Sequence, residues 1–310
     1  MNDYLTLDWS KQDPENRMGL FRGGAFTAPN NNFTFLLALI GAGLFFLFEF
    51  FAMTALAKKW TFLTVFVDPV IRTANLTVTI PIVILFFWCL SILFLKGRKI
   101  RFQEKALTLA TVPQQVDFAL TEESAATVLQ RLGMLVDSPR NFILLNRVER
   151  ALSNLKNVGG VSDVSSILKS QAENDESFIY SSYLKVQGFV WAIPVLGFIG
   201  TVMGLSKSIG NFAGTLKASG DVEAIKSSLT EVTGGLSTAF ETTLIALVAS
   251  LLIQLYLTRS QERENKFLDD CNDYCHSHVI SKLRVAQPQD AYAQYYYSQI
   301  AAQQGQQAQQ

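Results

Sequence analysis

The sequence predicts an all-α integral membrane protein with four transmembrane helices and a helical cytoplasmic extension. Three observations support this fold class. Of the 310 residues, 49% are hydrophobic and only 17% are charged, below the roughly 25% charged residues that are usual in a soluble domain. Four long apolar stretches each reach the about 20 residues that a helix needs to cross a bilayer. The segment between the second and third stretches repeats apolar residues at helical spacing.

The four predicted spans are nearly free of charge. Glu49 in the first span and Glu241 in the fourth are the only acidic residues within them. The first stretch starts too late and is too long for a signal peptide, so we expect it to be a true span. The spans are 33–57, 73–95, 186–209 and 236–258.

Lysines and arginines beside the spans predict the orientation. The densest basic cluster, KGRKIRFQEK at 96–105, follows span two, and Arg259 and Arg263 follow span four. Because positive residues collect on the cytoplasmic side, both termini are predicted to be cytoplasmic, and Lys58 and Lys59 on the outer side are outnumbered. The remaining segments are then an N-terminal cytoplasmic segment 1–32, outer loops 58–72 and 210–235, a cytoplasmic helical domain 96–185, a cytoplasmic helix 259–285 and a disordered Gln-rich tail 286–310.

One unusually long helix is predicted to run from the cytoplasm into the membrane. Between 162 and 209 the only helix breaker of note is Pro194. We expect Pro194 to bend the helix gently, since a neighbouring helix can bond to the carbonyl that proline leaves free. Behind span four, apolar residues at about 3.5-residue spacing predict a coiled-coil seam, and hence cross-linking of Cys271 between subunits.

Small residues line one face of span three. Gly200 and Gly204 form a GxxxG motif, and span four carries a matching stripe of alanine and threonine. Helices in lipid associate by close backbone approach at such residues. We expect that one chain cannot bury both stripes alone, which predicts an oligomer. The residues predicted to pack are Pro194, Gly197, Gly200, Gly204, Ala239 and Ala246.

Polar residues of spans three and four are predicted to share one level of the membrane. Thr201 and Thr243 both lie roughly 10 Å below the outer surface at 1.5 Å per residue, and Glu241 falls in the same layer. A carboxylate at this depth marks an ion pathway or a buried partner. Both interpretations of Glu241 stay open, the second being an ion pair with a lysine of the outer loop. The predicted ion-pathway residues are Thr201, Thr242, Thr243 and Glu241.

The sequence lacks the residues that other function classes require. Intramembrane proteases need catalytic serine, paired aspartate or zinc-binding histidine arrangements, and none of these patterns occurs. The segment CNDYCHSH at 271–278 has no second cluster that would complete a metal site. The net charge of zero gives no reason to expect nucleic acid. We therefore expect neither an enzyme nor a bound metal or cofactor.

Two stretches carry a resemblance to a known family. AIPVLGFIGTVMGL at 192–205 and GGLSTAFETTLIALVAS at 234–250 resemble the two core helices of the MotA/TolQ/ExbB proton-channel family. The first core helix of that family carries Pro-x-x-Gly-x-x-Gly-Thr-Val, found here at 194–202, and the second carries pore-facing alanine and threonine, here Ala239 and Thr243. The resemblance covers about 160–258.

The resemblance implies a function for the whole chain. Such proteins form a homopentamer in the bacterial inner membrane around a dimer of single-span partners of the MotB/TolR/ExbD kind, and ion flow through the partner's aspartate drives rotation. Four spans with an inner N-terminus are similar to MotA-like members, whereas the clean signature is similar to TolQ and ExbB, so the driven process stays open. TolQ- and ExbB-like members place an acid where this chain has Thr238. The alternative is a four-span scaffold without ion conduction.

Overall fold

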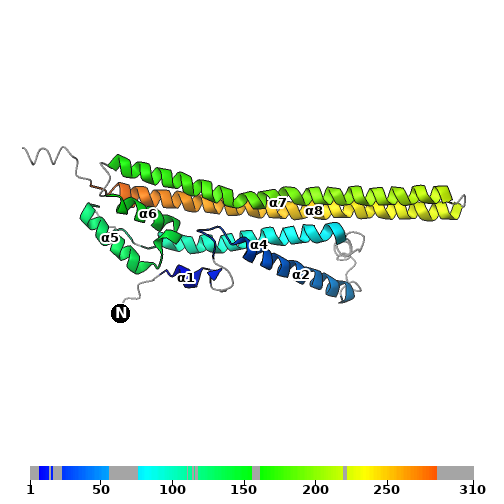
Figure 1. Ribbon diagram of the computed structural model, residues 1–310, viewed down its shortest axis with the longest axis horizontal. Helices are drawn as coiled ribbons and strands as arrows, with labels where there is room; N and C mark the ends of the chain where they lie inside the picture. Colours follow the sequence, from blue (N-terminus) through cyan, green and yellow to red (C-terminus); the bar gives the residue numbers. More distant parts are fainter. Residues whose placement is uncertain are drawn as a thin grey trace, which may run out of the picture. The chain divides into compact units, whose positions relative to one another are not determined.

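The computed structural model describes residues 7–13, 15–16, 23–55, 76–109, 111–113, 115, 118–155, 161–218 and 222–284. Within these ranges the regular elements are all helical, which confirms the predicted all-α class. The predicted outer loop 58–72 and the tail 286–310 lie outside the described residues. The elements, labelled in part in Figure 1, are α1 (Trp9–Gln12), α2 (Asn31–Ala55), α4 (Leu76–Leu107), α5 (Glu122–Leu135), the 3-10 turn η2 (Pro139–Asn141), α6 (Ile143–Ser153), α7 (Val161–Ala218), α8 (Val222–Tyr274) and the π-helical turn η4 (Cys275–Ile280).

Four of these helices are long and apolar enough to cross a membrane, namely α2, α4, α7 and α8. The described part of each predicted span falls on one of them, so the chain is a multi-pass membrane protein. The predicted long helix 162–209 is also one uninterrupted element, α7. The structure differs at the connection predicted as outer loop 210–235, because α7 continues to Ala218 and α8 begins at Val222. Gly210, Gly214 and Gly234 of this segment lie inside these helices, where an added Cβ atom would meet nothing within 4 Å.

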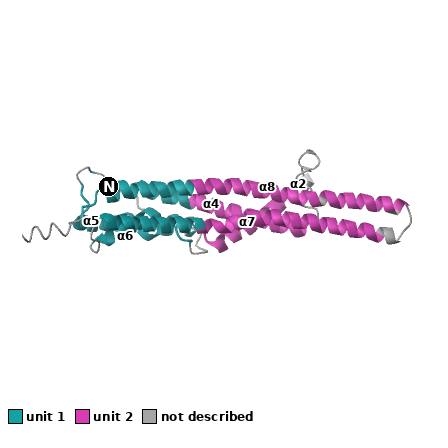
Figure 2. Ribbon diagram, turned by 90° about the horizontal axis from the view of Figure 1, so that it is seen from above, with its two compact units in different colours: residues 1–28, 99–180, 263–310 teal, residues 29–98, 181–262 magenta. Residues whose placement is uncertain are grey.

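The chain divides into two compact units, which Figure 2 distinguishes by colour. Unit 2 comprises residues 29–98 and 181–262 and contains all four predicted spans. Unit 1 is assembled from three separate stretches, 1–28, 99–180 and 263–310. Helices α4, α7 and α8 each contribute one part to each unit.

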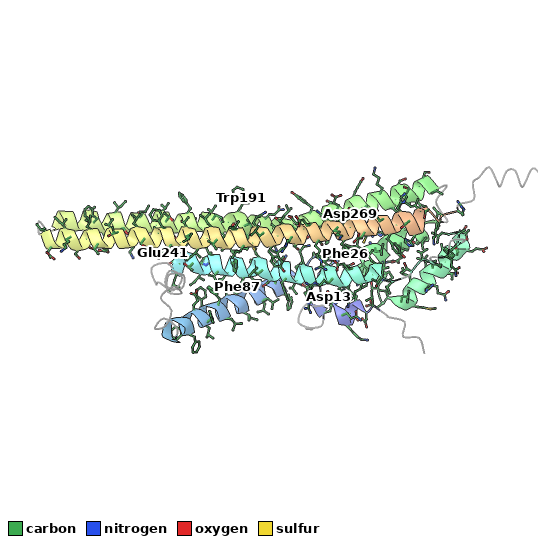
Figure 3. The ribbon with its side chains drawn as sticks, turned by 180° about the vertical axis from the view of Figure 1, so that it is seen from behind. Asp13, Phe26, Phe87, Trp191, Glu241 and Asp269 are labelled. Atoms are coloured by element: carbon green, nitrogen blue, oxygen red, sulfur yellow. The ribbon has the colours of Figure 1, made fainter. Side chains whose placement is uncertain are left out.

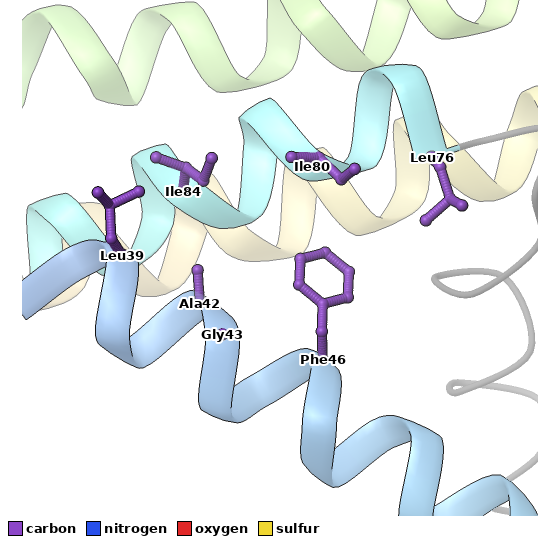
Figure 4. Close-up of a pocket in the computed structure, with 7 residues that line it drawn as sticks. All are labelled: Leu39, Ala42, Gly43, Phe46, Leu76, Ile80 and Ile84. Atoms are coloured by element: carbon purple, nitrogen blue, oxygen red, sulfur yellow. The ribbon is translucent and has the colours of Figure 1, made fainter.

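In unit 2, α2 packs against α4 at a glycine. A Cβ atom on Gly41 would lie 2.8 Å from the ring of Phe87, so the two helices approach closely there. The indole of Trp88 donates a hydrogen bond to Thr34 Oγ1 at 3.1 Å. Farther along, an apolar groove of about 350 Å³ opens between the two helices (Figure 4). Because its lining offers no hydrogen-bonding side chain, this groove is no candidate for passing an ion.

The core of unit 1 forms where α5 and α6 meet the C-terminal end of α4, from residue 99 onward. Phe142 is fully buried, and its ring lies 5.3 Å from that of Phe102 and 5.4 Å from that of Trp9. Thr121 and Ser124 form a capping box that starts α5. Distant parts of the chain also pair through their backbones: the Leu7 amide donates to the Leu135 carbonyl, and Leu120 pairs with residues 282 and 284.

A buried ion cluster fixes the N-terminal segment within unit 1. Lys99 is fully buried, and its Nζ lies 2.8 Å from Glu15 Oε2 and 3.6 Å from Asp13 Oδ1. The same ammonium donates to the carbonyls of Gly24 and Ala28. Burial raises the pKa of the Asp13 carboxyl, although the Lys99 charge opposes this rise. Lys99 belongs to the basic cluster that predicts orientation, and it also holds the N-terminal segment through buried contacts.

Candidate ion site

The candidate site lies in unit 2, where α7 and α8 pack together along the small-residue stripes. A Cβ atom on Gly197 would lie 2.5 Å from Ala246 Cβ, and one on Gly204 would lie 3.1 Å from Ala239 Cβ. Real Cβ atoms do not approach that closely, so glycine is required at 197. Ala239 and Ala246 are 1% and 0% exposed. The two stripes of one chain therefore cover each other, and the expectation that they need a neighbouring copy is wrong.

Thr201 and Thr243 are brought together by this close packing. Their hydroxyl oxygens lie 2.5 Å apart. Thr201 Oγ1 can donate to the Ala239 carbonyl at 2.9 Å or to the Gly197 carbonyl at 3.3 Å. Thr243 Oγ1 can donate to the Gly197 carbonyl at 3.1 Å. Both side chains are half-buried, so the pair sits at the edge of the helix interface and keeps one open side.

The proton count of this pair decides what it can bind. Each threonine hydroxyl has one proton to donate and two lone pairs that accept. The two main-chain carbonyls and the partner hydroxyl are enough to take both protons, so most of the lone pairs remain available. The hydroxyl pair is therefore suited to accept a hydrogen bond from water, from hydronium or from a protonated carboxylic acid.

Thr242 takes part in packing between the helices. It is 2% exposed, and its hydroxyl donates to the Ala239 carbonyl in its own helix at 2.8 Å. A Cβ atom on Gly200 would lie 2.8 Å from Thr242 Oγ1. The structure thus places Thr242 within the packed interface, away from the open side of Thr201 and Thr243.

Glu241 is not brought next to the two paired hydroxyls. It precedes Thr243 by two residues, and two residues are about 200° apart around an α-helix. Glu241 is half-buried, and Ser237 of the same helix donates to its Oε1 at 3.3 Å. Figure 3 labels Glu241 on α8 and shows Trp191 projecting outward from α7, where it is 79% exposed.

Ser250 compensates for the missing N–H of Pro194, a role that the sequence did not reveal. Proline has no N–H, so Pro194 leaves the Val190 carbonyl without its helical partner. Ser250 of α8 donates its hydroxyl hydrogen to that carbonyl at 2.9 Å. The sequence places Ser250 on the small-residue face of span four, but the spacing of one helix cannot show which carbonyl of another it reaches.

The expectation about Cys271 is wrong. Cys271 is fully buried within unit 1, so it is not available for cross-linking to another subunit. Burial raises the pKa of the Cys271 thiol, and it raises that of Cys275 to about 11. Since the thiolate is the reactive form, burial lowers the reactivity of both thiols.

The family comparison covers this site. Residues 137–272 match the model of the MotA/TolQ/ExbB proton channel family. Comparison with curated proteins and with solved structures gives no match. The matched range includes η2, α6, all of α7 and nearly all of α8, and thus both helices that carry the hydroxyl pair. Residues 137–272 of the chain are therefore similar to the MotA/TolQ/ExbB proton channel family, and Thr201 and Thr243 lie within the matched range.

Proposed function

We propose that this protein is the pore-forming subunit of an ion-driven motor in a bacterial inner membrane, with both termini cytoplasmic. Five copies surround a dimer of single-span partners of the MotB/TolR/ExbD kind, and α7 and α8 line the central pore. Ion-motive force, with H⁺ as the expected ion, is converted into mechanical work through the partner.

The contact between Thr201 and Thr243 carries the proposal. Helix packing alone would be served by alanine or valine at these positions, whereas two facing hydroxyls inside an apolar helix pair supply hydrogen-bonding capacity at membrane depth. The family match to 137–272 supports the same function class. In the assembled pore, the free lone pairs accept a hydrogen bond from the partner's protonated aspartic acid or from a water that relays the proton.

The outer faces of α7 and α8 support an assembly in the membrane. Phe198, Leu244 and Leu251 are 64%, 59% and 59% exposed in the single chain. Apolar side chains at this exposure need lipid or protein around them. Because the glycine stripes are covered within the chain, these outer faces replace them as the surfaces available to neighbouring copies.

Isosteric substitution tests the proposal. Valine has nearly the shape of threonine without its hydroxyl, so Thr201→Val with Thr243→Val removes the hydrogen bonding and leaves the packing. We expect ion flux in liposomes containing the complex with its partner to fall at least tenfold, with the pentamer still intact by native mass spectrometry. Serine at both positions keeps the hydroxyls and should retain most of the flux. Thr258→Val is the matched control, because the Thr258 hydroxyl donates only within its own helix, to the Gln254 carbonyl.

Two further results separate the alternatives. Wild-type flux in an intact complex of the double valine variant would remove the mechanism and favour the scaffold. Glu241→Gln addresses the untested acid: a lowered flux with a changed pH dependence would place Glu241 in the pathway. Unchanged flux with slightly lower stability would assign Glu241 a structural role.

A further inference from the structure

A polar pocket of about 380 Å³ lies in unit 1, between α6, α7 and α8. All of its lining residues belong to unit 1 and to the described part of the chain. Each of the two long helices contributes one face, with residues spaced three and four apart, as neighbours on a helix surface are. Arg147 of α6 completes the lining. The faces are Lys169, Ala172, Glu173 and Glu176 of α7, and Asn265, Leu268, Asp269 and Asn272 of α8.

Arg147 brings an unsatisfied hydrogen-bond donor to this pocket. Its side chain is 1% exposed. Its Nε donates to Asp175 Oδ2 at 2.7 Å, and its Nη1 donates to Asn272 Oδ1 at 2.5 Å. Its Nη2 is buried and has no hydrogen-bond partner among the described residues. Because a buried N–H without an acceptor is costly, this nitrogen is suited to an acceptor group of a ligand.

Asn272 and Lys169 add donors at the same end of the pocket. Arginine can only donate, so the amide oxygen of Asn272 faces Arg147, and the amide nitrogen keeps both of its N–H groups. The order of the contacts between the small-residue stripes shows that α7 and α8 run in opposite directions. Lys169, the first lining residue of α7, therefore lies toward Asn272, the last of α8. Three donor side chains at one end suit a carboxylate.

The rest of the pocket is acidic. Glu173, Glu176 and Asp269 are exposed, and none of them forms an ion pair with another described residue; Figure 3 labels Asp269 on α8. Since Asp175 balances the charge of Arg147, these three carboxylates face a single ammonium, that of Lys169. The pocket therefore favours a ligand that carries more positive than negative charge.

We propose that this pocket binds a free basic amino acid of the L-lysine type. The α-carboxylate accepts hydrogen bonds from Arg147 Nη2 and the Asn272 amide, and the two ammonium groups face the acidic side chains. Ala172 and Leu268, midway along the two walls, provide apolar surface for the aliphatic stem. The site contains none of the residues of the proposed ion pathway, so it does not depend on whether the chain conducts ions.

Isothermal titration calorimetry of the full-length protein in detergent, with L-lysine as the probe, tests the site. Analogues that each lack one group test the two ends separately. Cadaverine lacks the carboxylate, ε-aminocaproate lacks the α-ammonium, and L-norleucine lacks the ε-ammonium. We expect saturable binding of L-lysine and at least fivefold weaker binding of every analogue.

Substitutions on α8 locate the binding in this pocket. Asn272→Asp keeps an oxygen for Arg147 but replaces the amide donors by a carboxylate, so L-lysine should bind at least tenfold more weakly. Asp269→Asn removes one exposed acid and should weaken binding at least threefold. Asp270→Asn is the matched control, because Asp270 is exposed on the same helix and does not line the pocket; it should change the affinity less than twofold.

Three results would overturn the proposal. Cadaverine bound as tightly as L-lysine would show that no carboxylate is held at the donor end. Equal affinity in Asp269→Asn, Asn272→Asp and the Asp270→Asn control would place any binding elsewhere. No saturable binding of L-lysine at millimolar concentration would leave ordered water as the partner of Arg147.

Discussion

At the scale of single residues, the contact between Ser250 and Val190 explains how a proline is kept inside a membrane helix. The Pro194 ring removes one main-chain donor, and the carbonyl of Val190 would be costly to leave unpaired in lipid. Ser250 supplies the missing donor from α8 at 2.9 Å. The same hydrogen bond also joins α7 to α8. The contact that satisfies the carbonyl left free by Pro194 therefore also helps the two helices to associate.

A double-mutant cycle measures this compensation. Ser250→Ala should lower the free energy of unfolding by about 1 kcal/mol, within the range found for hydrogen bonds between membrane helices. With Pro194→Ala, the Val190 carbonyl regains a partner in its own helix, so Ser250→Ala should then cost much less. Unfolding in mixed micelles of mild detergent and sodium dodecyl sulfate gives the four free energies. Equal costs of Ser250→Ala in both backgrounds would show that the serine does not compensate the proline. Thr258→Ala, at an exposed hydroxyl that bonds only within its own helix, is the control.

At the scale of elements, α7 and α8 pack closely because Gly197 and Gly204 of α7 lie against Ala246 and Ala239 of α8. The sequence predicted which residues these are, since a helical face follows directly from spacing. The partner of that face could not be predicted, because periodicity identifies a surface and does not say whether its own chain or another copy covers it. The same limit applies to Cys271, whose apolar face turned out to lie inside its own unit.

Glycine substitutions separate this packing from general effects on helix propensity. Gly197→Val would drive a side chain into Ala246 and the Thr243 backbone, where an added Cβ atom already lies 2.5 Å and 3.2 Å from its neighbours. We expect it to separate the helices and to lower the free energy of unfolding by about 2–3 kcal/mol, as overpacking of an interior does. Gly210→Val is the control, since an added Cβ atom there meets nothing within 4 Å. Comparable losses of stability in both variants would contradict the packing role of the stripe.

At the scale of the whole molecule, the four spans were predictable because the membrane imposes a length and a composition on each of them. The arrangement of unit 1 was not predictable, since its contacts join residues that are far apart in the sequence. Lys99 shows this most clearly: as one charge of KGRKIRFQEK it indicates orientation, yet its partners Asp13 and Glu15 lie more than 80 residues earlier. The position of a basic residue beside a span therefore does not reveal whether its side chain is buried.

Removing Lys99 should uncover this role. Lys99→Met removes the buried ammonium that contacts Asp13 and Glu15, and we expect a loss of about 3–5 kcal/mol in the free energy of unfolding at pH 7.5. The folded-state pKa of Asp13 is already raised by burial, and without Lys99 it rises further. A raised pKa contributes stability at low pH that is lost as the pH rises through that value, so the variant should regain part of its stability on acidification.

Chemical denaturation in detergent between pH 5 and 8, with Arg101→Met as the control, provides the measurement. Arg101 is exposed on the same helix, so its removal should change stability by less than about 0.5 kcal/mol at any of these pH values. A Lys99→Met variant as stable as the control at pH 7.5 would show that the ion cluster does not hold the N-terminal segment.

The three-part construction of unit 1 also determines when it can form during synthesis. Chains emerge from the N-terminus first, so residues 7–28 leave the ribosome well before Lys99 and Leu135, with which they make contact. The main-chain hydrogen bonds of Leu120 can form only after residues 282–284 have been synthesised, and these residues follow the last span. The four spans are therefore all translated before unit 1 has its final strand-like contact. A ribosome that stops between residues 259 and 281 therefore releases a chain that has all four predicted spans but lacks the main-chain partners of Leu120 at 282 and 284.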